Sequence, residues 1–267
     1  MKKLVIIHGV TGAIGSACMA EFASKKDFVV YGISRKAVDH GKFCEKGILP
    51  VKTIIFSLNE TSPTKMANDL SVSIDVSKFS HVYYIHAVGV YPFELNDKGE
   101  HIVSHDYDKD GIDDRCQELT NKLFLSFWLE LSRKHGKRFT GLLFGGLADK
   151  HRPVVHSSWW KTIKKTVGQV KFQQKRGYLG NFVLLNISSV LCPNEIISRP
   201  FVFTKTDSDP AFWLLPWEVS SFVSKIFSNK LKSYQQHNLF KKNPNFVSNY
   251  YEDKKFTPRK RKELFGK

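Results

Sequence analysis

Residues 1–20 have the sequence MKKLVIIHGVTGAIGSACMA, and the order of their three parts decides the fold. The apolar run Leu4–Ile7 has the length of a buried strand, and the residues from Ser16 to Ser24 favour a helix. The glycine-rich turn HGVTGAIG, residues 8–15, lies between them. This order of strand, turn and helix is typical of a site for dinucleotide phosphates, because glycine lets the backbone approach a pyrophosphate at the helix N-terminus.

Two alternatives exist for this stretch. The glycines could form only a turn that joins a strand to a helix. Lys2 and Lys3 before apolar residues could also begin a secretory signal, whose apolar core is ~7–15 residues long. The run here is shorter and is interrupted by His8 and Gly9. We therefore expect no secretory signal in this segment.

The glycines Gly9, Gly12 and Gly15 follow the spacing Gly-x-x-Gly-x-x-Gly. In this setting the spacing resembles that of the short-chain dehydrogenase/reductase (SDR) superfamily, in particular its extended and atypical branches. The resemblance extends over residues 3–228. It implies that a cofactor lies against Gly9, Thr11, Gly12, Ala13, Ile14 and Gly15.

Strands and helices are expected to alternate along the rest of the chain. Such alternation, with a glycine turn after the first strand, predicts an α/β fold with one Rossmann-type, doubly wound parallel sheet flanked by helices. We expect further strands at residues 28–33, 51–56, 81–85, 140–144 and 182–185, the last extending at most to residue 190. We expect helices at residues 62–70, 115–135, 157–174 and 216–227.

Three residues after the second predicted strand, Ser34, Arg35 and Lys36, bear on the choice of dinucleotide. A site that prefers NAD usually has an acidic residue here, about 20 residues after the glycines, to hold the ribose 2′-hydroxyl. Two cations and a hydroxyl suit a 2′-phosphate instead, although a surface turn could carry the same residues. The sequence therefore predicts NADP(H) as the cofactor.

The segment after the fourth predicted strand resembles the Asn-Ala-Gly segment that lines the cofactor in the superfamily. It consists of His86, Ala87, Val88 and Gly89. Many members also have an acidic residue after the third strand that touches the adenine. Residues 57–59 are Ser-Leu-Asn, so the sequence does not predict a contact between an acidic residue and the adenine.

The catalytic half of the superfamily pattern is incomplete. The resemblance implies a Ser just after the fifth strand, but this chain has Gly145 and Gly146 there. It also implies a Tyr-x-x-x-Lys pair on the next helix. If Lys161 is the lysine, Ser157 takes the place of the tyrosine, and if Lys164 is the lysine, Trp160 does.

Neither Ser157 nor Trp160 can act as a phenol does. A serine hydroxyl is a far weaker acid, and an indole has no suitable proton. His156 is the nearby candidate for a substitute acid, because imidazole titrates near neutral pH. Asn121, on helix 115–135, takes the place of an Asn that helps to build a proton relay in the superfamily. A solvated loop histidine and a solvated helix asparagine are the alternatives.

The net charge of +16 comes from two zones of the 267-residue chain. Residues 150–194 contain eight Lys/Arg and no acid, and residues 228–267 contain eleven Lys/Arg and three acids. Such zones can attract anionic substrates or partners, or can be solvated surface and a loose tail. We expect a small-molecule substrate, and an anionic substrate would suit the positive charge of the protein. We do not expect a nucleic acid partner. A homodimer is left open.

Hydropathy and cysteine spacing predict where in the cell the protein is found, and the order of the segments predicts its domains. No segment approaches the ~18 apolar residues of a membrane span, so no membrane partner is expected. Cysteines are scattered without metal-ligand spacing, which predicts no metal and reduced thiols in the cytoplasm; they are Cys18, Cys44, Cys116 and Cys192. The predicted domains are a dinucleotide-binding domain at residues 1–228 and a basic C-terminal extension at residues 229–267.

Two functions agree with these patterns. The first is a divergent NADP(H)-dependent oxidoreductase that acts on an unidentified carbonyl or alcohol, with Lys161 or Lys164 and a substitute acid. The second is an SDR-like pseudoenzyme that binds a nucleotide or a partner without catalysis. The intact glycine turn favours the first function, and the missing Ser and Tyr favour the second.

Overall fold

A computed structural model provides the structure of the protein. It describes residues 1–34, 52–55, 63–73, 75, 78–88, 93–95, 97–98, 101–103, 114–146, 157–188, 190 and 213–241.

A parallel sheet organises the described part of the chain, with seven strands in the order β3-β2-β1-β4-β7-β8-β9. Every neighbouring pair in it is parallel. The strands are β1 (Lys2–His8), β2 (Phe28–Ser34), β3 (Lys52–Ile55), β4 (Phe79–His86), β7 (Phe139–Gly146), β8 (Asn181–Ile187) and β9 (Tyr234–Leu239). The chain runs outward from β1 to β3 and then returns to place β4 on the other side of β1. This order confirms the predicted doubly wound sheet.

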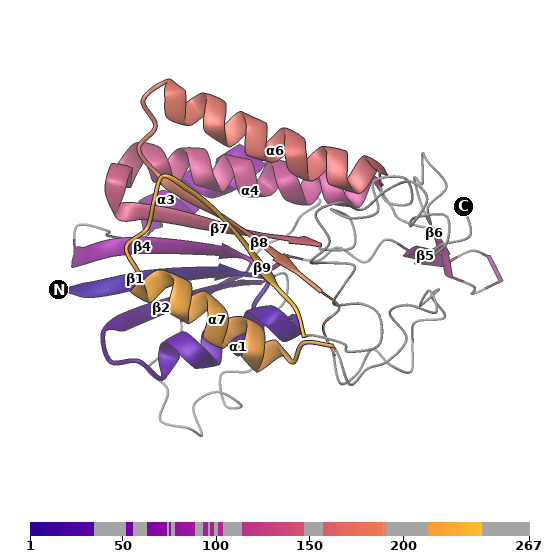
Figure 1. The fold of residues 1–267 in the computed structure, drawn as a ribbon, viewed down its shortest axis with the longest axis horizontal. Coiled ribbons are helices and arrows are strands. Elements are labelled where there is room, and N and C mark those ends of the chain that lie inside the picture. Colours follow the sequence, from indigo (N-terminus) through magenta and orange to yellow (C-terminus); the bar gives the residue numbers. More distant parts are fainter. Residues whose placement is uncertain are drawn as a thin grey trace.

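Helices cover both faces of this sheet (Figure 1). One face carries α3 (Pro63–Ser73), α4 (Asp114–His135) and α6 (Ser157–Lys175). The other face carries α1 (Ala13–Ala23) and α7 (Pro216–Ser228). A short 3-10 helix, η2 (Gly136–Arg138), joins α4 to β7.

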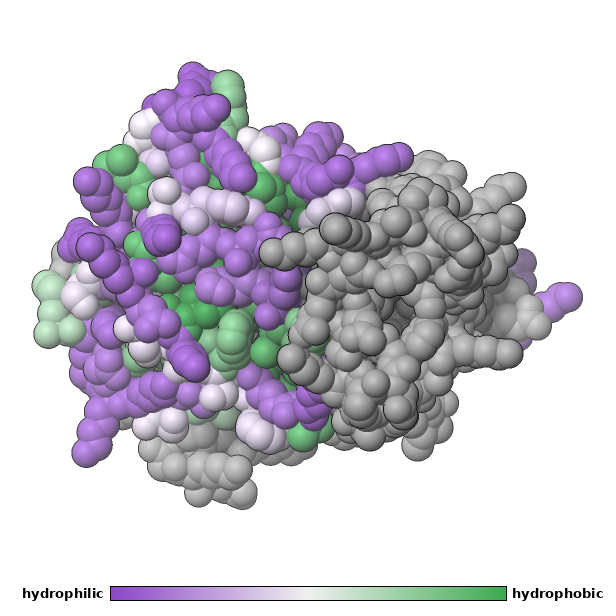
Figure 2. All heavy atoms as spheres, in the orientation of Figure 1, coloured by the Kyte–Doolittle hydropathy of each residue, from purple (hydrophilic) through white to green (hydrophobic). Residues whose placement is uncertain are grey.

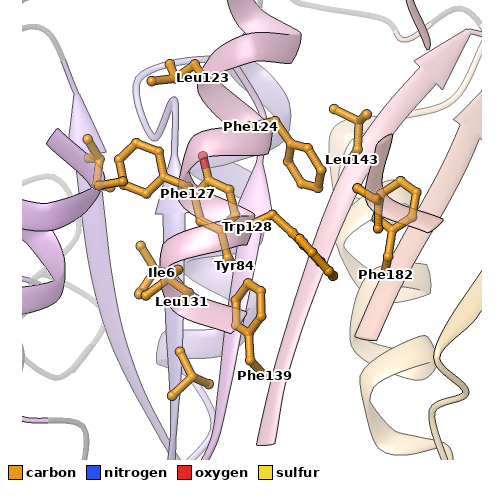
Figure 3. Close-up of a cluster of buried hydrophobic side chains, with 14 of the residues drawn as sticks. Ile6, Tyr84, Leu123, Phe124, Phe127, Trp128, Leu131, Phe139, Leu143 and Phe182 are labelled. Carbon is orange, nitrogen blue, oxygen red and sulfur yellow. The ribbon is translucent and has the colours of Figure 1, made fainter. Parts of the chain in front are cut away.

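The core has two layers because the central strands are buried on both sides. Alternate residues of β1 divide between the layers: Leu4 and Ile6 face α4, whereas Val5 and Ile7 face α1 and α7. The layer under α4 is rich in aromatic rings, and Figure 3 shows Tyr84 among Phe124, Phe127 and Trp128.

Gly141 makes room for the largest of these rings. A Cβ atom on this residue would lie 2.6 Å from Cδ1 of Trp128. The indole Nε1 of Trp128 donates a hydrogen bond to the carbonyl of Asn181 at 3.1 Å. The glycine in the middle of β7 is therefore needed for α4 to pack against the sheet.

The predicted helices and strands are confirmed, with ends that differ by a few residues. Helix α4, predicted at 115–135, covers Asp114–His135, and helix α6, predicted at 157–174, covers Ser157–Lys175. Between β4 and α4 the structure also has a short antiparallel hairpin of β5 (Phe93–Leu95) and β6 (His101–Val103), for which the sequence analysis predicted no strands.

The predicted boundary at residue 228 needs a correction. Strand β9 lies beyond it and pairs in parallel with the whole of β8. Tyr234 packs against Phe182 with ring centroids 5.7 Å apart, and Lys171 of α6 lies 4.0 Å from the Tyr234 ring centroid. The ordered sheet therefore extends to residue 239, and residues 229–239 are not part of a basic tail.

The surface of the described region is mostly hydrophilic (Figure 2). Exposed cations follow one another along α6, namely Lys161, Lys164, Lys165, Lys171 and Lys175. None of the helices in the described ranges is both apolar enough and long enough to span a bilayer.

Candidate nucleotide site at the carboxyl edge of the sheet

The glycine turn joins β1 to α1 in a conformation that only glycine adopts easily. Gly9 has a φ of +89°, and a Cβ atom on it would lie 2.5 Å from the carbonyl oxygen of Ala87. Its N–H donates to the carbonyl of Ile33 at 2.9 Å, while the N–H of Gly12 donates to the carbonyl of Gly9 at 3.0 Å. The turn is therefore anchored to both β2 and the segment after β4.

The other two glycines of the turn have different surroundings. A Cβ atom on Gly15 would overlap the carbonyl group of Gly9, so Gly15 is needed for α1 to approach β1. A Cβ atom on Gly12 would meet only the Gly9 oxygen, at 3.4 Å, and Gly12 is exposed. Gly12 therefore faces open space, where a ligand could approach the backbone.

Helix α1 begins at Ala13 without a side-chain cap. Gly12 is its N-cap and makes no side-chain hydrogen bond, and its first turn has no acidic residue. The first N–H groups of a helix lack intrahelical acceptors and carry partial positive charge. This helix end can therefore accept an anionic group such as a phosphate.

The sheet changes direction between β1 and β4, next to this turn. Ligands of open α/β sheets bind outside the carboxyl ends of the strands at such a switch point. His8 and His86, the last residues of β1 and β4, are register partners there. The N–H of Ala87 donates to the carbonyl of His8 at 2.9 Å, which holds the two strand ends together.

The hydroxyl of Tyr84 connects the two histidines. Nδ1 of His8 lies 3.2 Å from this oxygen, and Nδ1 of His86 lies 2.9 Å from it. Figure 3 shows the Tyr84 oxygen at the end of the ring away from Phe139. The His8 ring packs edge-on against Phe127 at 5.5 Å between centroids. We call His8, Tyr84 and His86 the polar triad.

Burial keeps the polar triad neutral. It lowers the pKa of His8 from 6.5 to about 3 and raises the pKa of Tyr84 well above 10. The pKa of His86 lies well below 6.5, first because of burial and second because of His8; a hydrogen bond with the backbone of Thr120 opposes this shift. Both histidines are therefore neutral imidazoles at pH 7.

Asn121 is buried on α4, and its Oδ1 accepts a hydrogen bond from Gln117 at 3.0 Å. Its Nδ2 has no hydrogen-bond partner within the described structure. Buried polar atoms are nearly always hydrogen-bonded, so this nitrogen is an exception among the buried groups of α4.

A further unsatisfied buried atom lies at the end of β7. A Cβ atom on Gly145 would lie 2.5 Å from Oδ1 of Asn186, its register partner on β8. Asn186 is completely buried, its Nδ2 donates to Oδ1 of Asn238 at 3.1 Å, and its own Oδ1 has no partner in the described region. The Asn186 amide thus takes up the space that a side chain at residue 145 would need.

Comparison with known proteins supports only the fold. No family model matches the sequence, and no curated protein matches it. Solved structures do match. An alcohol dehydrogenase from the archaeon Thermococcus sibiricus, complexed with 5-hydroxy-NADP, has a TM-score of 0.62 and 15% identity, over 92% of this chain and 100% of that one. At this identity the match shows that the two chains share a fold.

Two other solved structures share this fold with similar TM-scores. A short-chain dehydrogenase/reductase from Serratia marcescens has a TM-score of 0.61 and 13% identity, over 89% of this chain and 96% of that one. A 3-hydroxyacyl-CoA dehydrogenase type-2 from Mycobacterium avium has a TM-score of 0.62 and 10% identity, over 90% and 96% of the chains.

The fold of this chain places two of the predicted cofactor segments together. The glycine turn and the segment of His86, Ala87 and Val88 meet at the switch point, since Gly9 touches Ala87. Ser34 ends β2 and is buried. Three predicted cofactor residues lie outside the described residues, namely Arg35, Lys36 and Gly89.

The predicted catalytic residues do not come together in the way that the predicted cofactor segments do. Lys161 and Lys164 are both exposed on α6, whereas Trp160 is half-buried against the core. Ser157 is the first residue of α6, and His156 lies outside the described residues. Asn121 is buried on α4, one helical turn before Phe124, whose ring contacts His86.

The sequence analysis missed His8, Tyr84 and Asn186. His8 and Tyr84 lie in apolar strands, where a single polar side chain gives little signal about its partner on another strand. Within the described ranges no three His, Cys, Asp or Glu side chains come together as metal ligands. Cys18 is buried, and burial raises its pKa to about 12, which is typical of an unreactive thiol.

Proposed function

We propose that the protein binds NADP(H) at the carboxyl edge of its sheet and is a divergent oxidoreductase of the SDR type. The observation that carries this proposal is the uncapped start of α1 at the glycine turn. Gly9 and Gly15 are fixed by close packing there, whereas Gly12 faces open space. A helix end with free N–H groups and an approachable backbone suits a pyrophosphate.

Similar structures support a nicotinamide cofactor. One is an alcohol dehydrogenase complexed with 5-hydroxy-NADP, another is serine dehydrogenase complexed with NADP+, and a third is a 4-hydroxyisoleucine dehydrogenase mutant complexed with NADH. Our preference for NADP(H) rests on the sequence after β2. Arg35 and Lys36 would pair with a 2′-phosphate, and no acidic residue lies beside them.

The chain's own residues would divide the work at this site. The α1 N-terminus would hold the pyrophosphate, and Lys161 or Lys164 would be available to a ribose. When bound, NADPH supplies a hydride. A donor for the substrate proton is not evident among these residues. Gly145 and Gly146 lie where an SDR enzyme has its Ser, and Trp160 or Ser157 takes the position of its Tyr.

A nucleotide-binding pseudoenzyme is the second candidate function. The observation that favours it is the Asn186 amide, which lies against Gly145 and leaves no room for a serine side chain there. Trp160 packs against the core on α6, so a phenol is also missing from one of the two possible positions. This candidate retains the nucleotide site and loses only the chemistry.

Fluorescence titration tests the shared part of both candidates. The five tryptophans supply the signal, and NADPH and NADH are added separately to the full chain. We expect saturable binding that is tighter for NADPH. The control is Gly12→Val, which places a branched side chain where the phosphate must approach. The absence of saturable binding for either nucleotide would contradict the proposal.

Turnover separates the two candidates. NADPH oxidation is followed with a panel of aldehydes and ketones, first for the native chain. Two double variants then restore the missing groups: Gly146→Ser with Trp160→Tyr, and Gly146→Ser with Ser157→Tyr. Activity in one double variant but not the other would identify Lys164 or Lys161, respectively, as the lysine at the site.

A further inference from the structure

The amino edge of the sheet, opposite to the candidate nucleotide site, collects most of the positive charge of the protein. We define this edge as the starts of the strands other than β3, with the chain that leads into them: residues 1–3, 24–28, 72–73, 75, 78–80, 133–139, 171–181 and 225–234. These residues include fifteen Lys or Arg and two Asp, so they carry +13 of the net charge of +16. In Figure 1 the amino edge lies on the left with the N-terminus, and the strand arrows point away from it.

Contacts between neighbouring segments join the amino edge into one surface. The N–H of Lys3 donates to the carbonyl of Asp27 at 2.8 Å, which ties the start of β1 to the turn before β2. Burial lowers the pKa of His81 near the start of β4, and the charges of Lys3 and Arg138 lower it further. The cations of β1 and η2 therefore act on the same place.

The same surface continues to the ends of α6 and α7. A Cβ atom on Gly136 would lie 3.8 Å from Cβ of Leu179, in the turn between α6 and β8. Nε2 of Gln174 donates to the carbonyl of Ser233 at 2.6 Å, which joins the end of α6 to the segment before β9. The cations on these segments are thus neighbours in space although they are distant in the sequence.

Few acidic side chains offset the cations of the amino edge. Four cations have an acidic partner, in the pairs Lys3–Asp27, Lys25–Glu21, Lys78–Asp75 and Arg133–Glu130. The other eleven are exposed and form no ion pair with an acidic side chain of the described residues; they are Lys2, Lys26, Lys134, Lys137, Arg138, Lys171, Lys175, Arg176, Lys225, Lys230 and Lys232. Like charges gathered on one side repel one another, and an anionic partner relieves this repulsion.

Exposed apolar side chains lie on the same edge. Among the described residues six large apolar side chains are exposed, and four of them belong to the amino edge. Their exposed fractions are 84% for Met1, 80% for Val72, 56% for Phe172 and 52% for Leu179. Arg176 lies over the Phe172 ring, 5.7 Å from its centroid, so basic and apolar groups are interspersed. Figure 2 shows hydrophilic side chains over this edge with apolar ones among them.

Cations interspersed with apolar side chains suit the surface of an anionic bilayer. The lipid headgroups attract the cations, and apolar side chains beside them can enter the interfacial layer. A nucleic acid would also attract the cations, but its phosphate backbone offers no favourable surroundings to aliphatic side chains such as Val72 and Leu179. The sequence analysis expected no membrane partner because no segment is long enough to span a bilayer, and a surface contact needs no such segment.

We propose that the amino edge binds the surface of a membrane that contains anionic lipids, with its cations at the headgroups and its four exposed apolar side chains in the interfacial layer. In this orientation the glycine turn faces away from the bilayer, so a dinucleotide reaches it from the solvent. The proposal goes beyond the proposed function and does not depend on it, because the two use opposite edges of the sheet.

Sedimentation of the full chain with lipid vesicles tests this proposal. The vesicles consist of phosphatidylcholine alone, or of phosphatidylcholine and phosphatidylserine in a ratio of about 2:1. We expect binding to the vesicles with phosphatidylserine, and we expect it to weaken between ~0.1 M and ~1 M salt, where the Debye length falls from ~10 to ~3 Å. The absence of this binding, or equal binding to both kinds of vesicle, would overturn the proposal.

A charge variant tests whether the amino edge makes the contact. It combines Lys134→Gln, Arg138→Gln and Lys175→Gln. Each cation near an anionic bilayer contributes about fivefold to affinity, so we expect this variant to bind roughly a hundredfold more weakly. The matched control combines Lys65→Gln, Lys122→Gln and Lys165→Gln, which removes the same charge from exposed positions in the first halves of α3, α4 and α6. An equal loss in the control would mean that net charge alone attracts the vesicles, and would overturn the proposal.

An apolar variant separates a bilayer from other polyanions. We expect Phe172→Ser with Leu179→Ser to bind the vesicles about tenfold more weakly, because both side chains lose their place in the interfacial layer. The control is Leu119→Ser with Trp217→Ser, which are also exposed but lie at the starts of α4 and α7, and it should bind as the native chain does. Unchanged binding in the first variant would overturn the proposal, and tight binding of a labelled RNA oligonucleotide would then identify a nucleic acid as the partner. None of these measurements contains NADPH, so their failure leaves the proposed function untouched.

Discussion

Lowering the pH from 8 to 5 should destabilise this protein through its buried histidines. An unfolded histidine has a pKa near 6.5 and takes up a proton over this range. In the folded protein, burial lowers the pKa of His8 to about 3, so His8 remains neutral at pH 5, and burial also lowers the pKa of His86 well below 6.5. The unfolded state then binds more protons than the folded state, and the free energy of unfolding falls with pH.

The size of this loss can be worked out for His8. With an unfolded pKa of ~6.5 and a folded pKa of about 3, protonation at pH 5 stabilises the unfolded chain by about 2 kcal/mol. This is a substantial part of the ~5–15 kcal/mol of a typical domain, and the lowered pKa of His86 acts in the same direction. The stability is fully present above pH 6.5 and is lost progressively as the pH falls toward the folded pKa values.

Urea unfolding at pH 8 and pH 5 measures this difference. We expect His8→Asn to reduce this difference in unfolding free energy by about 2 kcal/mol, and His86→Asn to reduce it as well. The control His237→Asn removes a half-exposed histidine on β9 and should change it much less. Burial also lowers the pKa values of His81 and His135 to about 4, so these histidines add to the loss of stability at low pH. Both are present in every variant, so their contribution cancels when the variants are compared. The same pH dependence in His8→Asn as in the native chain would refute the reasoning.

The remaining predictions concern the nucleotide and its chemistry. Arg35→Ala should remove most of the preference for NADP(H) over NAD(H), roughly ten- to a hundredfold for one charge-assisted contact, as measured by fluorescence titration; full discrimination by the variant would exclude this residue. Gly12→Val should abolish nucleotide binding and leave Tm nearly unchanged, whereas Gly15→Val should lower Tm because its side chain meets the Gly9 carbonyl. Equal Tm values for the two variants would contradict the conclusion that Gly15 is needed for α1 to pack against β1. The pseudoenzyme candidate predicts that the native chain oxidises no NADPH with a carbonyl panel, since general acid catalysis alone is worth about 10²–10⁴-fold. Robust turnover that is lost in Lys161→Ala or Lys164→Ala would contradict the pseudoenzyme and support the oxidoreductase.

The glycine turn shows what a local pattern can predict. The apolar run of β1, the three glycines and the start of α1 are adjacent in the sequence, so their order alone specified a strand, a turn and a helix. Their different surroundings could not be predicted in this way. Gly9 meets Ala87 and Gly15 meets Gly9, and the first of these contacts depends on the placement of a strand more than 70 residues later.

Strand β9 and the polar triad show the opposite case. The residues of β9, YQQHNL, are half-exposed at the edge of the sheet, so no apolar alternation distinguishes them from the basic region around them. The triad joins β1 to β4, and a single histidine at the end of an apolar strand gives no sign of its distant partner. In both cases the deciding interactions are long-range, and a single sequence does not record them.

The position of β9 has a consequence for how the chain folds during synthesis. Strand β8 has β7 on one side, but its other edge is covered only when residues 234–239 arrive after α7 has crossed the sheet. The ribosome must therefore synthesise some fifty further residues while this edge of the apolar strand β8 has no neighbouring strand. Exposed strand edges favour pairing with other chains. A nascent chain stalled after α7 should be prone to aggregation, whereas one stalled well beyond β9 should not.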